Sequence, residues 1–83
     1  MTHAYALARE LAEPVARGDL PHTHALATLL TGTVRAERLG ELGPYKAPDV
    51  YRLQRHLFGQ QLERLRRKMA IEAMHQRWEK RHG

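Results

Sequence analysis

The sequence predicts an all-α fold of three helices, in which a short N-terminal helical hairpin packs on a long basic C-terminal helix. Apolar residues recur at helical spacing in three stretches, and the breaks between them, residues 18–21 and 40–48, are rich in glycine and proline. The stretch from Asp49 to Arg81 contains one glycine and no proline. A single helix of about 33 residues, roughly 50 Å long, is therefore expected there.

The first helix is expected to present Leu7 and Leu11, four residues apart, to the core. Pro14 falls late in this pattern. It should kink the helix or end its first part near Glu13, because proline clashes with the preceding turn and donates no hydrogen bond. Gly18 then provides a C-terminal stop.

The second helix should run from about residues 21–23 to residues 38–39. Gly32 weakens this helix by about 1 kcal/mol relative to alanine. Close packing against a neighbouring helix is the preferred explanation, and a hinge is the alternative. Six leucines are expected to be buried together in the core: Leu7, Leu11, Leu26, Leu30, Leu57 and Leu65.

The apolar positions of the last helix change face near Met69. Ile71, Met74 and Trp78 then follow at spacings i, i+3 and i+7, away from the earlier band. Helices of about 15 residues span only about 22 Å and cannot cover the whole long helix. Residues 1–69 are therefore expected to form the body and residues 70–83 to protrude. Before Met69 the apolar band is expected to contain Val50, Leu53, Leu57, Phe58, Gln61, Leu62, Leu65 and Met69.

This protruding part predicts a protein interface at Ile71, Met74 and Trp78, since tryptophan and exposed apolar ridges are common at interfaces. A second copy of the chain is the preferred partner, which makes the protein a homo-oligomer or part of a larger complex. In the alternative, the helix breaks near Met69 and its tail folds back over the body, burying Trp78.

The net charge of +5 is distributed unevenly. Residues 1–43 carry four arginines against five acids, whereas residues 44–83 carry ten lysines and arginines against four acids. Such asymmetry indicates a nucleic acid or an acidic protein surface as partner. The alternative is a solvated helix face that only keeps the protein in solution. The residues predicted to contact the partner are Lys46, Arg52, Arg55, Arg66, Arg67, Lys68, Arg77 and Arg81.

The function expected from this pattern is that of a small non-enzymatic binding protein. Its basic long helix would contact nucleic acid or a nucleoprotein complex, as in a phage or mobile-element accessory factor. The alternative is a protein-interaction module, an oligomerising adaptor or inhibitor, whose arginines dock on an acidic protein surface. Residues 28–65 have the order of a helix-turn-helix, but the connecting loop exceeds the standard turn of about three or four residues.

Other classes of function have little support. The chain has no cysteine and no serine, so thiolate zinc sites and the commonest nucleophiles are missing. Two possible metal-ligand pairs, His22 with His24 and His75 with Glu79, lack further ligands at a suitable spacing. No enzyme activity, metal, cofactor or small-molecule substrate is expected. The sequence has no apolar run of about 18 residues and no leader pattern, so we expect a cytoplasmic protein without a membrane partner.

Overall fold

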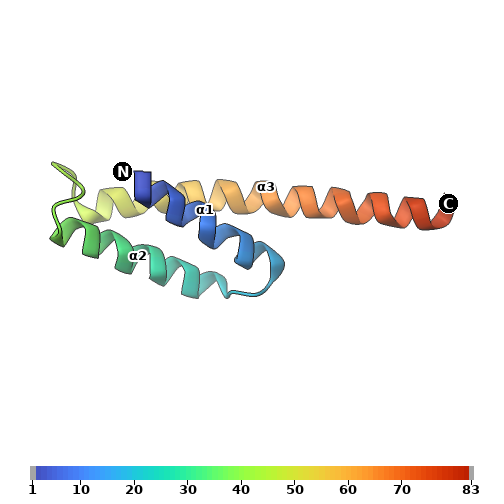
Figure 1. Ribbon diagram of the computed structural model, residues 1–83, viewed down its shortest axis with the longest axis horizontal. Helices are drawn as coiled ribbons and strands as arrows, with labels where there is room; N and C mark the ends of the chain where they lie inside the picture. The colour runs from blue at the N-terminus through green and yellow to red at the C-terminus, as the bar shows by residue number, and fades with distance from the viewer. Residues whose placement is uncertain (1, 83) are drawn as a thin grey trace.

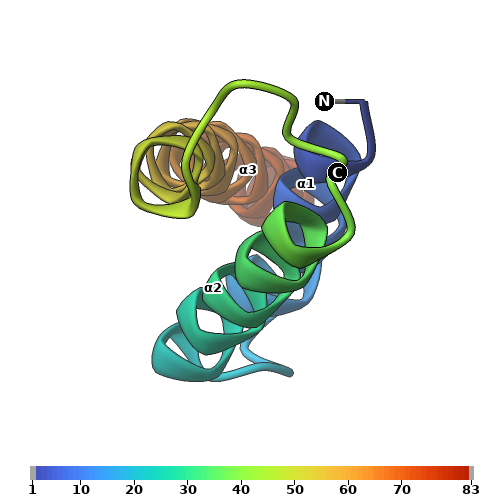
Figure 2. The ribbon, with the colours of Figure 1, turned by 90° about the vertical axis from the view of Figure 1, so that its left-hand side faces the viewer.

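The computed structural model describes the backbone of residues 2–82 and the side chains of residues 6–82. Three helices make up this part of the chain: α1 (Thr2–Arg17), α2 (His22–Arg38) and α3 (Ala47–His82). Helices α1 and α2 form a hairpin that packs on the first half of α3, while the rest of α3 continues alone (Figure 1). The expected all-α architecture is therefore confirmed. Viewed end on, the three helices lie around a common axis (Figure 2), and every pair is in contact.

Glycines end both helices of the hairpin. Gly18 and Gly40 have left-handed backbone angles, with φ of 82° and 74°, which residues with a side chain rarely adopt. The residue after each glycine donates a backbone hydrogen bond to the carbonyl five positions earlier, which is the Schellman arrangement. These bonds join Asp19 N to Pro14 O and Glu41 N to Ala36 O, both at 2.9 Å.

Of the two expectations for Pro14, a kink or an end of the first part of α1 near Glu13, the second is wrong, because the helix continues through Pro14 to Arg17. Proline leaves the carbonyl of Glu10 without its helical donor. Glu10 is exposed, so water can take the place of that donor. The carbonyl of Pro14 itself accepts the capping hydrogen bond from Asp19 N–H. This bond closes the last turn of α1.

The core is built on alanines that let the helices approach closely. Ala8 and Ala12 of α1 and Ala25 of α2 are at most 1% exposed, and they face the larger Phe58 of α3. Small side chains at the contact shorten the distance between helix axes. The complete cluster of buried residues consists of Ala8, Ala12, Val15, Ala25, Leu29, Phe58 and Leu62.

The expected core of six leucines is wrong in its details. Leu30 is 44% exposed, and its neighbour Leu29 is fully buried instead. The other five leucines are half-buried: Leu57, and the four that pack against the buried cluster, Leu7, Leu11, Leu26 and Leu65. Because the alanines occupy the centre of the contact between helices, the leucines flank it.

The buried face of α3 is also rotated from the expected band. Leu53 and Met69 are 40% and 39% exposed. The buried positions follow at intervals of four residues from Val50 through Gln54 and Phe58 to Leu62. Gln54 takes a central position that an apolar pattern could not reveal.

The buried Gln54 meets a buried hydroxyl on α2. Thr33 Oγ1 donates to the carbonyl oxygen of Leu29 at 2.7 Å and lies 3.2 Å from Gln54 Oε1. A hydroxyl has one proton, so the two acceptors share it. Both side chains are at most 3% exposed, and a shift of one residue between α2 and α3 would separate them. The pair therefore fixes the register of the two helices.

The connection between α2 and α3 is held by an apolar cluster and by a hydrogen bond. Leu42 packs with Ala47 and Val50 in a second buried cluster. The backbone N–H of Ala47, at the start of α3, donates to the carboxylate of Glu37 on α2. A carboxylate at a helix N-terminus accepts a hydrogen bond from a backbone N–H that has no partner within the helix. Its negative charge also interacts favourably with the positive end of the helix dipole. Glu37 thus joins the end of α2 to the beginning of α3.

Gly32 of α2 packs closely against Leu7 of α1. A Cβ atom at this position would lie 3.1 Å from Leu7 Cδ2, which is tighter than normal contact. The explanation of Gly32 by close packing is therefore confirmed.

Truncating Leu29 and Leu30 separately tests the orientation of α2. Leu29→Ala should destabilise the protein by about 2–5 kcal/mol, since it leaves a cavity in the core. Leu30→Ala should cost less than about 1 kcal/mol, because nearly half of that side chain is already in water. Urea denaturation measures both values. Equal losses would show that α2 presents a different face to the core.

The Thr33–Gln54 pair predicts non-additive effects. Thr33→Val should cost about 1–3 kcal/mol, because it leaves the buried Gln54 amide without this partner. Adding Gln54→Leu should recover most of that loss, since both polar groups are then gone. The four proteins of this double-mutant cycle are compared by urea denaturation. Simple addition of the two single effects would exclude an energetic coupling between the side chains.

Candidate interaction surfaces on the long helix

Five of the predicted basic residues share one exposed face of α3. At about 100° per residue they fall within roughly 80° of one another, and Arg52 points about 160° away from the buried Gln54. Arg52 therefore points away from the hairpin, while Arg66, Arg77 and Arg81 lie in the part of α3 where every residue is exposed. We call the shared face the basic face, and it consists of Arg52, Arg55, Arg66, Arg77 and Arg81, all exposed.

The other three predicted basic residues lie elsewhere. Arg67 is at the edge of the basic face, and its Nη2 atom is paired with Glu63 Oε1 at 2.6 Å. Lys68 points to a different side of α3, and Lys46 precedes the helix. All three are exposed.

Glu63 lies on the same side of α3, beside Arg52 and Arg55, but none of the five arginines of the basic face is ion-paired within residues 6–82. Within residues 6–82, the ion pairs are the Glu63–Arg67 pair and two contacts of Arg17 with Glu13 and Asp19 on the hairpin. No acidic side chain in that part of the chain comes within pairing distance of the five arginines. Their field is therefore directed at solvent, where a polyanion can reach it.

Gly59 lies in the middle of this face and was not among the predicted contact residues. It follows Arg55 by four positions and Arg52 by seven, so the helical spacing alone would have placed it there. A Cβ atom at Gly59 would meet no other atom within 4 Å. Glycine at this position is thus a cost to the helix that packing in residues 6–82 does not explain. Together with Gln60 it leaves a shallow hollow between Arg52, Arg55 and Glu63.

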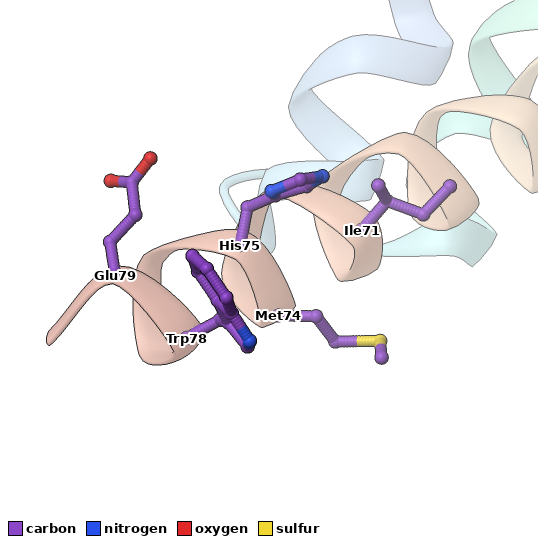
Figure 3. Close-up of a pocket in the computed structure, with 5 residues that line it drawn as sticks. All are labelled: Ile71, Met74, His75, Trp78 and Glu79. Atoms are coloured by element: carbon purple, nitrogen blue, oxygen red, sulfur yellow. The ribbon is translucent and has the colours of Figure 1, made fainter. Parts of the chain in front are cut away.

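The predicted interface residues form a second surface, near the end of α3. Ile71, Met74 and Trp78 are 57%, 67% and 62% exposed. They lie within about 60° of one another, and Ile71 is about 180° from the buried Leu62. Figure 3 shows them together with His75 and Glu79 on the isolated helix. We call Ile71, Met74 and Trp78 the distal ridge.

The segment that carries the distal ridge does not fold back. Helix α3 is continuous from Ala47 to His82, which contradicts the alternative of a break near Met69. Every residue from Arg66 to His82 is exposed. The one ring contact of Trp78 among the described residues is with His82 on the next turn, at a centroid distance of 4.5 Å and an interplanar angle of 42°.

The two possible metal-ligand pairs, His22 with His24 and His75 with Glu79, lie in different parts of the structure. The centroid of the His22 ring lies 5.5 Å from that of the Phe58 ring, and both His22 and His24 are exposed. His75 and Glu79 stand beside the distal ridge. Within the described chain no three histidine, cysteine or acidic side chains gather as a metal-binding group.

None of the helices in the described residues combines the length and apolar character needed to cross a membrane. Comparison with protein families, with curated proteins and with solved structures finds no match to this chain.

Replacing Gly59 with alanine tests whether this glycine has an internal role. Gly59→Ala should raise the free energy of unfolding by about 0.5–1 kcal/mol, because it removes the entropic cost of glycine from an exposed helix position with free space. Gly32→Ala is the comparison, since its Cβ would crowd Leu7 and offset the same gain. Thermal and urea denaturation measure the difference. A destabilised Gly59→Ala protein would mean that Gly59 relieves strain in α3.

Proposed function

We propose that this chain is a small non-enzymatic binding protein whose basic face contacts the phosphate backbone of nucleic acid, alone or within a nucleoprotein complex. The observation that supports it is a row of unneutralised arginines along the solvent side of one straight element. Arginine suits this purpose because its planar group donates two parallel hydrogen bonds to a phosphate. A protein that binds nucleic acid must share its compartment, so the proposal includes a cytoplasmic location.

The length of the basic face supports contact with the backbone rather than with one base step. From Arg52 to Arg81 it extends for roughly 44 Å, longer than one turn of duplex DNA at about 34 Å. Arginines spread over this distance meet several phosphates that are separated along the duplex. Phosphate contacts carry no direct sequence information, so binding should depend weakly on base sequence.

A protein-interaction module is the second candidate function. The same arginines are complementary to an acidic protein surface, and the exposed distal ridge is the observation that favours this candidate. The salt dependence of binding to nucleic acid distinguishes the two functions, since counterion release from a polyanion is a property of the first.

Salt titration with a short DNA duplex tests the proposed function. The affinity should fall steeply between about 50 and 200 mM salt, because each neutralised phosphate releases condensed counterions. Replacing Arg52, Arg55 and Arg66 with glutamine should reduce the log–log slope by about 0.9 for each phosphate that is no longer neutralised. Fluorescence polarisation of a labelled duplex measures both effects.

The matched control removes the same charge from the hairpin, by replacing Arg9, Arg35 and Arg38 with glutamine. These arginines are exposed and lie on α1 and α2. The slope should then stay close to that of the parent. Equal reductions of the slope in both triple variants would show that only the net charge of the protein matters. Absence of binding at low salt would refute the proposed function.

A further inference from the structure

The distal ridge is an apolar surface that the described chain leaves uncovered. Its three side chains are each more than half exposed and lie beyond the reach of the hairpin (Figures 1 and 3). Among the described residues of the body, the large apolar side chains that are more than half exposed are Leu39 and Tyr45, both in the connection between α2 and α3. Three large apolar residues on successive turns form a continuous surface of the kind that marks an interface.

The spacing of the ridge fits another helix. Ile71, Met74 and Trp78 follow at i, i+3 and i+7, the a–d–a pattern of one seam between two packed helices. The seam continues into Arg67 and Arg81, which occupy the neighbouring d positions. A partner helix would therefore cover the three apolar residues and meet arginine at both ends.

The charges around the ridge select the partner. Arg67, Lys68, Arg77 and Arg81 border it, and Glu79 is the acid beside it. A second copy of the chain would bring two such basic borders together. An occupant with acidic borders gains favourable charge pairs from the same residues.

We propose that the distal ridge is the docking surface for an acidic amphipathic helix of another protein. The apolar stripe of that helix packs on Ile71, Met74 and Trp78, and its carboxylates pair with the bordering arginines and lysine. Ile71 and Met74 donate no hydrogen bonds, so they offer nothing to the phosphate backbone that the basic face would contact. The inference shares Arg77 and Arg81 with the basic face, but the apolar contacts on which it rests are separate from that face.

Trp78 is the one tryptophan of the chain, so its emission reports on the ridge in the intact protein. The probe is a synthetic helical peptide of three heptads with leucine at a and d, glutamate at e and g, and no aromatic residue. Saturable binding with a blue shift of the Trp78 emission is the expected result. Met74→Lys should weaken this binding at least about tenfold.

Two control variants keep the test specific. Leu39→Lys makes a comparable change at an exposed apolar residue of the body and should leave the peptide affinity unchanged. The triple variant of Arg52, Arg55 and Arg66 to glutamine should also bind the peptide as the parent does, even where it no longer binds DNA. Far-UV circular dichroism establishes that Met74→Lys keeps its helix content.

Four results would overturn the inference. A scrambled peptide of the same composition that binds equally well would show that charge alone acts. A version with lysine in place of glutamate that binds equally well would remove the role of the basic border. A blue shift with phosphatidylserine vesicles but not with the peptide would assign the ridge to a membrane. A concentration-dependent blue shift together with dimers in sedimentation, without peptide, would assign it to a second copy.

Discussion

The difference in helix length governs this structure. Helix α3 has 36 residues, or about 54 Å, while α1 and α2 have 16 and 17. The protein is accordingly a rod of 57 × 19 × 15 Å. A hairpin of that size covers α3 only as far as Leu65, and no rearrangement of its side chains can extend the cover. The confined core, the free basic face and the exposed distal ridge all follow from this mismatch.

A core of this size leaves specificity to a few polar contacts. It contains few large buried side chains. Three of its members are alanines, which allow the helices to pack closely but bury little apolar area. The relative position of α2 and α3 is set by the shared proton of Thr33 and by the bond from Ala47 to Glu37. Capping glycines at Gly18 and Gly40 set where the hairpin turns. These contacts involve few residues, yet they decide which of several possible packings is adopted.

The number of helices and the position of the basic face could be read from the sequence, because both depend on local patterns. Glycine and proline separate the helices, and solvent-facing arginines need no partner in the chain. Which of the neighbouring Leu29 and Leu30 is buried could not be read, since it depends on where the alanines of α1 approach. Contacts such as Glu37 with Ala47 join residues of different helices, and no spacing within one helix reveals them.

The segment from Arg66 to His82 is exposed along its whole length, yet it is helical throughout. An isolated peptide of similar length would be marginal in water, because the first helical turn must be formed at a large entropic cost. Here that turn is already supplied by the folded part of α3, so only propagation is needed. The body is thus a nucleation seed for its own extension. Fraying should begin at His82 and proceed inward toward Leu65, and the segment can melt without loss of the body.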